Sequence, residues 1–305
     1  MEFSLIILRQ TILMSLFMLI GYLLYRGKKI DAQGSKSIAA LLVWAVIPAN
    51  VVKSCLLPYS SERMAQMAQC FYLAAAVLMI AMVISRICFR NDPVAQFAAS
   101  FSNAGFIGIP LVQASLGDGA VFFLIGIIIL LNLLQWTYGA KLLKGESEKL
   151  SIKSILLNPV TISAVAGVGL FALRLGDRLP PLLTSLVSGV AALNTPLAMI
   201  VLGVYLAQTE LGHLFTSGRL YFLSAVRLLL IPAVTIPVIL LLPGTHDMKM
   251  TLMIAAAAPV GANVAVYSQL YNRNYMYACE TVTQSTLLSI LTLPLMCALA
   301  GMVLR

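Results

Sequence analysis

Apolar runs long enough to cross a lipid bilayer follow one another along this chain, and no other feature constrains its fold as strongly. A spanning helix needs about 20 predominantly apolar residues. Only 10 % of the 305 residues are charged, whereas a soluble domain carries about 25 %. We therefore expect an all-α membrane protein with ten transmembrane helices. The runs lie near 4–25, 35–56, 66–88, 94–115, 120–140, 155–174, 181–207, 219–242, 249–270 and 275–303.

Lysine and arginine are distributed unequally over the loops that these runs define. Twelve lie in one set of short loops and six in the other, and cytoplasmic loops carry the excess of positive charge. Both termini are thus expected outside, with the loop at 141–154 in the cytoplasm. The first run is too long for the apolar core of a signal peptide, so it should remain as the first helix. The same loops account for the net charge of +9, and we expect no nucleic-acid partner.

Prolines and glutamines recur along the chain at almost one spacing, which indicates an internal repeat. Each copy would hold five spans, an odd number, so the second copy would enter the membrane from the opposite side, as in many secondary transporters. The predicted organisation is a first five-helix repeat at 1–140, a short cytoplasmic loop at 141–154 and a second, inverted five-helix repeat at 155–305. Because prolines are frequent in membrane helices, a chance coincidence is the alternative. The pairs are Pro48 with Pro196, 148 residues apart, and Pro110 with Pro259 and Gln135 with Gln284, each 149 apart.

The segment SFSNAGFIGIPLVQ at 100–113 should interrupt the fourth helix, and AAAAPVGAN at 255–263 should interrupt the ninth. Proline removes an amide donor and clashes with the preceding turn, and glycine loosens the backbone. In hydrocarbon such a break survives only where protein or a water-filled cavity satisfies the freed backbone groups. Two broken helices at corresponding positions are the best sequence indication of a midplane binding site. Their half-helix N-termini would favour an anion.

Polar side chains at membrane depth gather around these two predicted breaks. Asn50, Asn103, Asn132 and Asn263 can donate and accept hydrogen bonds without adding a charge. We interpret them as ligands for a carboxylate, and hydrogen-bonded contacts between helices are the alternative. An arginine at a helix centre costs about 2.5–3.5 kcal/mol, so Arg227 in the eighth span should face the protein interior. Substrate binding and a structural counter-charge are both open for Arg227.

Catalytic and metal-binding patterns are absent from the sequence. The five cysteines and two histidines lie far apart, without the short ligand spacing of a metal site. Paired aspartates, serine with histidine and HExxH do not occur at membrane depth. We expect no metal, no cofactor and no enzymatic activity.

Several segments resemble the auxin efflux carrier family, which includes plant auxin exporters and bacterial permeases for malate or malonate. They are SNAGFIGIPLVQASLGDGA, AVRLLLIPAV, MIVLGVYLAQ and PVGANVAVYSQLY followed by STLLSILTLPL, and the resemblance runs from about the second span to the tenth. Its most specific part is the stretch from Asn103 to GIPL. The chain lacks the large cytosolic loop of the long plant exporters and is similar to the bacterial branch. This similarity implies the bacterial inner (plasma) membrane.

The resemblance implies an NhaA- or bile-acid-symporter-like fold, in which ten helices in two inverted repeats divide into a scaffold domain and a transport domain. Broken helices four and nine would cross at Pro110 and Pro259. Motif positions of the family fall on Asn103, Asn132 and Arg227. The family also implies a small organic anion as substrate, an elevator-like motion, and a homodimer formed through the scaffold domain.

Residues and resemblance together predict a secondary active or facilitative transporter for small organic anions. These would be dicarboxylates such as malate and malonate, or auxin-like carboxylates. An anion channel and a non-transporting membrane receptor or scaffold are the alternatives. The expected partners are the substrate anion, the lipid bilayer and a second copy of the chain. The predicted substrate-binding residues are Asn50, Asn103, Pro110, Asn132, Pro259, Asn263 and Arg227.

Overall fold

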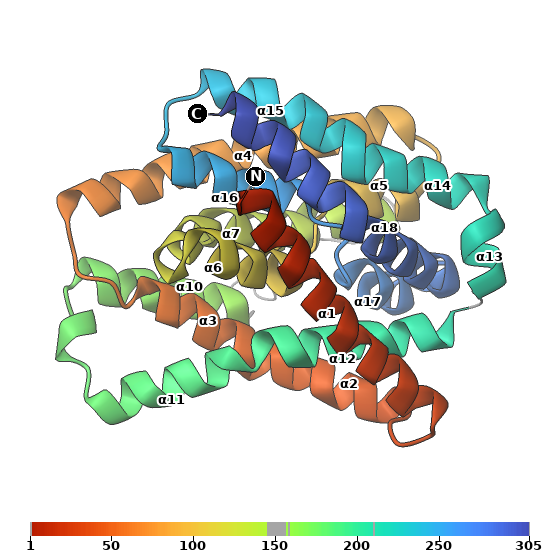
Figure 1. Ribbon diagram of the computed structural model, residues 1–305, viewed down its shortest axis with the longest axis horizontal. Coiled ribbons are helices and arrows are strands. Elements are labelled where there is room, and N and C mark those ends of the chain that lie inside the picture. Colours follow the sequence, from red (N-terminus) through yellow and green to blue (C-terminus); the bar gives the residue numbers. More distant parts are fainter. Residues whose placement is uncertain (1, 145–156, 158, 210, 305) are drawn as a thin grey trace.

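Helices form all the regular structure in the computed structural model, which describes residues 2–144, 157, 159–209 and 211–304 (Figure 1). The predicted all-α class is confirmed for these residues. Seven helical stretches are long and apolar enough to cross a membrane, and two apolar helices, Ala104–Leu116 and Pro159–Ala172, are shorter. The seven are Leu5–Arg26, Ala32–Cys55, Ser61–Cys88, Asp118–Lys144, Pro181–Gln208, Gly218–Leu241 and Tyr275–Val303.

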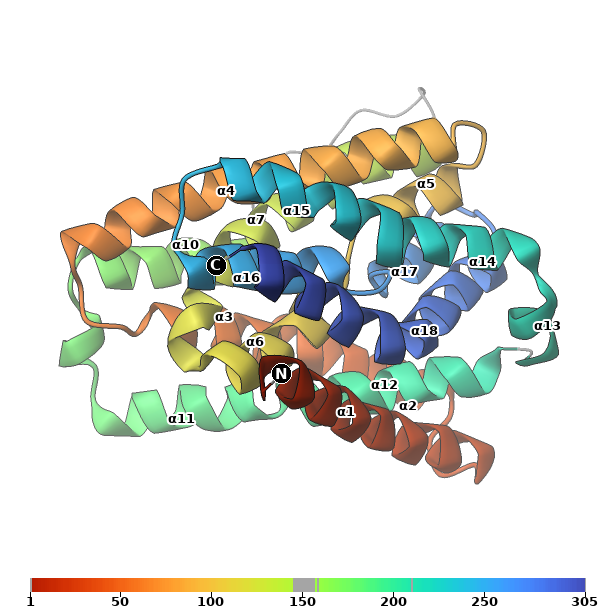
Figure 2. The same cartoon turned by 45° about the horizontal axis from the view of Figure 1, so that its top comes forward.

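Six helices from the beginning and the middle of the chain form a first group, which we call the α1 group. They are α1 (Glu2–Arg26), α2 (Ala32–Leu41), α3 (Ile47–Cys55), α10 (Pro159–Ala172), α11 (Pro181–Ala192) and α12 (Asn194–Gln208). α1 packs along α12, and α3 packs against α10 and α11. Figures 1 and 2 show α1, α2, α3, α11 and α12 together on one side of the molecule.

A second group, the α4 group, contains both long helices and short half-helices. The long ones are α4 (Ser61–Cys88), α7 (Leu124–Leu134) with α8 (Ala140–Lys144), α14 (Gly218–Ala225) with α15 (Ile231–Leu241), and α18 (Tyr275–Val303). The short ones are α5 (Pro93–Ser100), α6 (Ile109–Leu116), α16 (His246–Ala257) and α17 (Asn263–Leu270). α4 packs against α5, α7 and α15, and α18 packs against α14, α16 and α17.

Three short elements connect these helices. The 3-10 turns Asp118–Phe123 and Gly176–Arg178 precede α7 and α11. The helix α13 (Leu211–Thr216) lies between α12 of the α1 group and α14 of the α4 group. It therefore connects one group to the other, at the end of the molecule where α14 and α18 begin (Figure 1).

Two of the predicted spans are interrupted, as expected. The run at 94–115 forms α5 and α6, and the chain leaves helical geometry between them at 101–103. The run at 249–270 forms most of α16 and all of α17, with a similar interruption at 258–262. The predicted span at 155–174 lies partly outside the described residues, and its described part includes α10.

The two interruptions cross each other and pair through their backbones. Ser102 and Val260 face each other in an isolated antiparallel bridge. The amide of Asn103 donates to the carbonyl of Pro259 over 2.8 Å, and the amide after Val260 donates to the carbonyl before Ser102 over 3.0 Å. Each interruption thus satisfies backbone groups of the other, as the absence of water in a membrane interior requires.

Three prolines remain within continuous helical paths because a wider π-helical turn precedes each of them. The turns Leu42–Val46, Ala104–Gly108 and Val226–Leu230 are each followed directly by an Ile-Pro pair. In a regular α-helix the ring of a proline clashes with the carbonyl group four residues earlier, and proline has no N–H to donate to that carbonyl. A π turn is wider, because its hydrogen bonds join residues five apart instead of four. The expectation that the crossing lies at Pro110 is therefore wrong. Pro110 lies in α6, and the crossing lies at Ser102.

The guanidinium of Arg227 holds the C-terminal ends of both interrupted half-helices. Arg227 is 1 % exposed and donates to the carbonyl of Ala99, at the end of α5, over 3.1 Å. It also donates to the carbonyls of Ala256 and Ala258, at the end of α16, over 2.6 and 3.1 Å. Carbonyls at a helix C-terminus lack partners within the helix and carry partial negative charge. These contacts are those of a structural counter-charge, one of the two roles expected for Arg227.

α1 and α12 approach each other to backbone contact at two glycines. A Cβ atom on Gly203 would lie 1.9 Å from the carbonyl oxygen of Met18, and one on Gly21 would lie 2.1 Å from that of Ile200. Neither position has room for a side chain. Small residues allow membrane helices to pack this closely, and the contact fixes α1 on α12 within the α1 group.

Arg227→Met should destabilise the fold, because it would leave three buried carbonyls without their donor. One unsatisfied buried acceptor costs about 1–3 kcal/mol, so we expect a large fall in the free energy of unfolding. Arg227→Lys should cause a smaller fall, because an ammonium group cannot reproduce the planar fork of donors. Thermal unfolding in detergent micelles measures both. Arg9→Met is the matched control, since Arg9 also lies within a span but is exposed. An equal loss for both methionine variants would contradict the role of Arg227.

Gly203→Ala should separate α1 from α12 and lower the melting temperature in detergent. Forcing an extra methyl group into a packed interior typically costs about 1–3 kcal/mol. Gly189→Ala in α11 is the control, because the corresponding Cβ position at Gly189 has no atom within 4 Å. Alanine favours a helix over glycine by up to about 1 kcal/mol, so this variant should be neutral or stabilised. A loss of stability at Gly189 as large as that at Gly203 would argue against the close contact.

Candidate functional site

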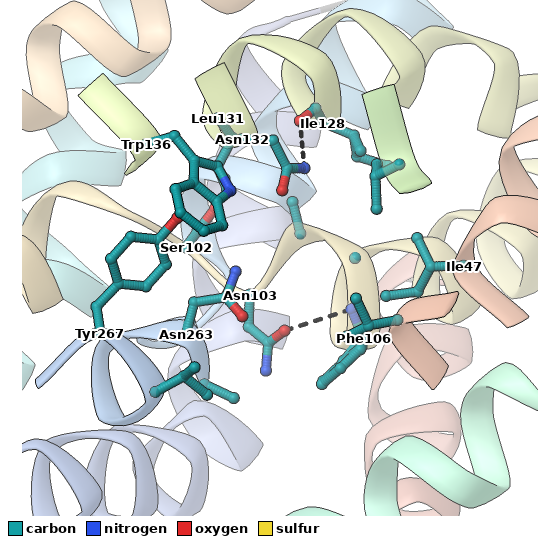
Figure 3. A pocket seen from close by; sticks show the side chains of 17 residues that line it. Ile47, Ser102, Asn103, Phe106, Ile128, Leu131, Asn132, Trp136, Asn263 and Tyr267 are labelled. Atoms are coloured by element: carbon teal, nitrogen blue, oxygen red, sulfur yellow. Dashed lines mark hydrogen bonds between the residues drawn. The ribbon is translucent and has the colours of Figure 1, made fainter. Parts of the chain in front are cut away.

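A cavity of about 200 Å³ lies beside the crossing of the two interrupted helices (Figure 3). Its wall is formed by the break before α6, by α7 and α17, and by the path from α2 to α3. None of the described residues that line it is charged. Its polar and aromatic lining residues are Ser102, Asn103, Phe106, Asn132, Trp136, Asn263 and Tyr267.

Asn103 begins the helical path that follows the first break. Its Oδ1 accepts a hydrogen bond from the amide of Phe106 over 3.3 Å, so the side chain caps the turn Ala104–Gly108 (Figure 3). Its Nδ2 group is buried and has no hydrogen-bond partner among the described residues. A buried donor without a partner costs about 1–3 kcal/mol. A ligand with a hydrogen-bond acceptor would remove that cost.

Asn263 begins α17, directly after the second break. Its Nδ2 donates to Oε1 of Gln135 over 2.8 Å. Gln135 is 1 % exposed, and its Nε2 is a second buried amide donor for which the described part of the chain offers no partner. The sequence marked Gln135 only as a member of the repeat and assigned it no role at the site. A glutamine within an apolar span is costly in lipid, which indicates a buried partner. Gln135 is linked to the cavity wall through its bond with Asn263 and is not itself a lining residue.

Asn132 lines the cavity from α7, one turn before Trp136 (Figure 3). Its Nδ2 donates to the carbonyl of Ile128 over 2.8 Å. An amide NH₂ group carries two hydrogens, so this bond within the helix uses one and leaves the second for a ligand. Asn132 is thus partly committed to its own helix.

Aromatic rings form another part of the cavity wall. The rings of Trp136 and Tyr267 meet edge to face with their centroids 5.2 Å apart, and Phe97 packs on Tyr267 at 5.2 Å. The hydroxyl of Tyr267 is buried and likewise finds no partner within the described ranges. The rings hold α17 against α5 and the π-helical turn that begins at Gln135. This packing fixes the position of Asn263, one turn earlier on α17.

Three of the seven predicted substrate-binding residues line this cavity, and four do not. Pro259 contributes only its carbonyl to the crossing, Arg227 is engaged with the half-helix ends, and Pro110 lies within α6. The three that the structure brings together are Asn103, Asn132 and Asn263.

Asn50 lies in a different cavity, of about 310 Å³, whose lining includes Lys53 and Asp118. It is 2 % exposed, and its Nδ2 donates to the carbonyl of Ala191 over 2.9 Å. Ala191 lies at the end of α11, where the chain bends before α12. The observed bonds of Asn50 are thus contacts between helices, the alternative that the sequence left open.

The cavity beside the crossing offers hydrogen-bond donors and helix starts without a formal charge. The turn Ala104–Gly108 follows Asn103, and α17 starts at Asn263. Amides at the start of a helix lack internal partners and carry partial positive charge, which suits an anion. The arrangement therefore favours a small anion.

Comparisons with known proteins extend over most of the chain. It is 25 % identical over 233 residues to a protein of Rhizobium meliloti (strain 1021) named "Putative malonate transporter", which covers 73 % of this chain and 71 % of that protein. Residues 6–297 match a protein family that is described as "Membrane transport protein". With its long apolar helices, the chain is an integral membrane protein. The resemblance found in the sequence is confirmed, and the chain belongs to the membrane transport protein family, which includes the auxin efflux carriers.

Proposed function

We propose that the chain is a secondary carrier for small organic anions and binds a carboxylate of its substrate in the cavity beside the crossing. One observation carries this proposal. Asn103 lines a cavity whose described lining residues carry no charge, and its Nδ2 is a buried amide donor without a partner among the described residues. Nε2 of Gln135, whose Oε1 accepts from the lining residue Asn263, is a second such donor. A carboxylate would accept from Asn103, Asn132 and Asn263, and the start of α17 would favour its negative charge.

The size of the cavity favours a small substrate. At about 200 Å³ it is smaller than the sites of drug-sized ligands, which hold about 300–1,000 Å³. A dicarboxylate of few carbons, such as malonate or malate, would fit better than a bulky aromatic acid of the auxin type. The relative from Rhizobium meliloti is named for malonate, so malonate is the first substrate to test.

We further propose that ten helices cross the membrane as two inverted repeats, at 1–140 and 155–305. The division of helices between the two groups supports this arrangement. In each half of the chain the earlier helices join the α1 group, the later helices join the α4 group, and one helix of the α4 group is interrupted. On the excess of lysine and arginine in one set of loops, we propose that the loop at 141–154 lies in the cytoplasm and both termini lie outside a bacterial inner membrane.

Alternating access would follow from movement of the α4 group against the α1 group. Both interrupted helices belong to the α4 group, whereas Val43 and Ile47 reach the cavity from the α1 group. A substrate at this boundary would travel with the α4 group in an elevator-like motion. The α1 group would then form the fixed scaffold and the surface of a homodimer.

Asn103→Ala should lower malonate uptake into proteoliposomes by at least tenfold, because a hydrogen bond to a charged group contributes about 1.5–3 kcal/mol. Uptake of labelled malonate is measured with and without malonate inside the vesicles. A carrier gives saturable uptake that internal malonate accelerates. Asn91→Ala is the matched control, since Asn91 is exposed in the turn before α5. Its uptake should equal that of the unmodified protein.

Other results would contradict the proposal in distinguishable ways. Flux that does not saturate and does not depend on Asn103 would indicate a channel. Binding of malonate without flux would indicate a receptor. Saturable uptake that Asn103→Ala leaves unchanged would retain the carrier and move its site away from the crossing.

A further inference from the structure

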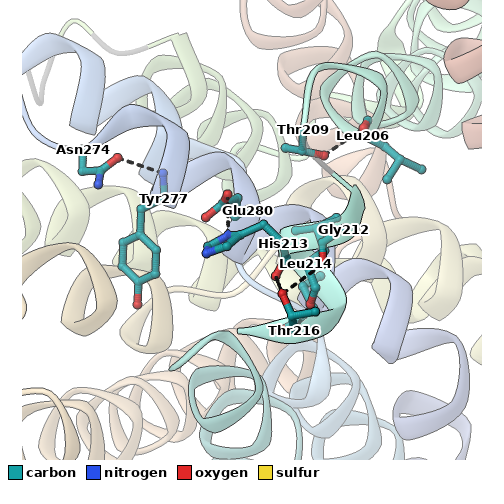
Figure 4. A network of polar contacts seen from close by, with 10 residues as sticks. Leu206, Thr209, Gly212, His213, Leu214, Thr216, Asn274, Tyr277 and Glu280 are labelled. Carbon is teal, nitrogen blue, oxygen red and sulfur yellow. Dashed lines mark hydrogen bonds and ion pairs between the residues drawn. The ribbon is translucent and has the colours of Figure 1, made fainter. Parts of the chain in front are cut away.

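Glu280 is a buried carboxylate for which the proposed anion site provides no role. Glu280 and Arg227 are the charged residues that the described part of the chain buries. Arg227 is occupied by three backbone carbonyls. Oε1 of Glu280 lies 2.9 Å from Nδ1 of His213, and Figure 4 shows the imidazole of α13 directed at this carboxylate of α18. A buried carboxylate in a membrane helix is a functional-site hypothesis by default, because its insertion is costly.

The pair joins a buried group to a solvent-exposed one. The side chain of Glu280 is 11 % exposed, whereas that of His213 is 53 % exposed. Histidine changes its charge near neutral pH more readily than other side chains. Because Nδ1 is the ring nitrogen at the carboxylate, a proton taken up from solvent at Nε2 allows the proton on Nδ1 to pass to Oε1, which leaves a neutral imidazole and a neutral carboxyl group. The reverse transfer returns the proton to solvent.

The pair also lies on the connection between the two helix groups. α13 follows α12 and precedes α14. A second contact holds α13 one turn further along α18, where Nε2 of Gln284 donates to the carbonyl of Leu214 over 2.7 Å. The hydroxyl of Ser224 in α14 donates to Oε1 of the same glutamine over 2.8 Å. A change of charge at Glu280 thus acts directly on the segment that must adjust when the α4 group moves against the α1 group.

Other ionisable groups around the start of α18 are engaged with one another. The side chain of Arg219, from α14, forms an ion pair with Asp92 before α5 and lies over the ring of Tyr277, 4.2 Å from its centroid. The hydroxyl of Tyr277 donates to Asp92 over 3.4 Å. Among the described residues, further titratable side chains near this turn include Tyr25 of α1, Tyr205 of α12, and Tyr275 and Cys279 of α18. Arg273, just before α18, donates from Nε to the carbonyl of Leu143. Glu280 and His213 therefore form a separate pair with its own route to solvent.

We propose that Glu280 and His213 form the proton-binding site that couples anion transport to a proton gradient. This inference rests on the proposed carrier function. Carboxylates are lacking among the described residues of the substrate cavity, so a coupling proton needs a site elsewhere, and Glu280 is the carboxylate that is both buried and linked to the moving boundary. A proton carried in the same direction as a dicarboxylate also lowers the net charge that crosses the membrane.

Two measurements on the same proteoliposomes test this coupling. The first is exchange of labelled external malonate for internal malonate at equal pH on both sides. The second is net malonate uptake under an imposed pH gradient, with a pH-sensitive dye inside the vesicles. Net malonate uptake by the unmodified protein should be faster with an acidic external side than at equal pH. The dye should report proton entry only when malonate is present.

Glu280→Gln should lose the acceleration by the gradient and the proton signal while measurable exchange persists, because glutamine resembles the protonated carboxyl group but cannot release a proton. Glu280→Asp retains a titratable carboxyl group and should retain proton entry. His213→Gln should slow net uptake more than exchange, since the route from solvent is interrupted. Glu62→Gln is the matched control, because Glu62 is exposed at the start of α4.

The possible failures separate this inference from the carrier function. Exchange without any effect of the gradient on the unmodified protein would overturn the coupling and leave the carrier intact. Full coupling in Glu280→Gln would show that the proton binds elsewhere. Absence of exchange in the unmodified protein would overturn the proposed function itself. If Glu280→Gln does not yield a folded protein, loss of proton entry in His213→Gln supports the site and unchanged proton entry in that variant overturns it.

Discussion

The architecture depends on one cation that satisfies the broken ends of two helices at the same time. Interrupting a helix inside a membrane exposes carbonyls that no water can reach, and the partial negative charges of two such ends repel each other. The guanidinium of Arg227 satisfies these carbonyls and offsets their mutual repulsion, because it donates hydrogen bonds to the ends of α5 and α16 at the same time. The bridge between Ser102 and Val260 can form because these two ends are held side by side. The cavity beside the crossing follows from this arrangement.

The cavity itself is built from dipoles, while formal charges lie elsewhere in the described structure. Asn103 and Asn263 each stand at the start of a helical path and add amide donors to the partial positive charge of the helix start. Such a site can hold an anion without a fixed cation that would retain it. A carrier must release its substrate on the other side, so recognition by dipoles suits the proposed cycle. The proposed proton site on α18 would likewise leave the substrate cavity unchanged.

The sequence predicted the elements that depend on local composition, and it failed where distant residues decide. Apolar runs gave the helices, and the glycines and prolines marked the two interrupted ones. The predicted place of the crossing, at Pro110, was wrong because that Ile-Pro pair is accommodated by a π turn, whereas the chain at 101–103 leaves the helix and pairs with Val260. Asn103, Asn132 and Asn263 were brought together as predicted. The sequence could not tell whether Asn50 and Gln135 bind a ligand or another helix. An amide at membrane depth is suited to both, and the fold determines which partner lies beside it.

The contact between α1 and α12 determines when this protein can finish folding during its synthesis. Gly21 leaves the ribosome 182 residues before Gly203, so the first helix enters the lipid long before the surface on which it packs exists. Likewise, the carbonyl end of α5 can bond to Arg227 only after Arg227 has been synthesised, and the segment at 101–103 can pair only after Val260 has been synthesised. These three contacts of the first half therefore form only after the second half has been synthesised. The packing of α1, α5 and the segment at 101–103 is thus completed late in synthesis, when residues 203, 227 and 260 have entered the bilayer.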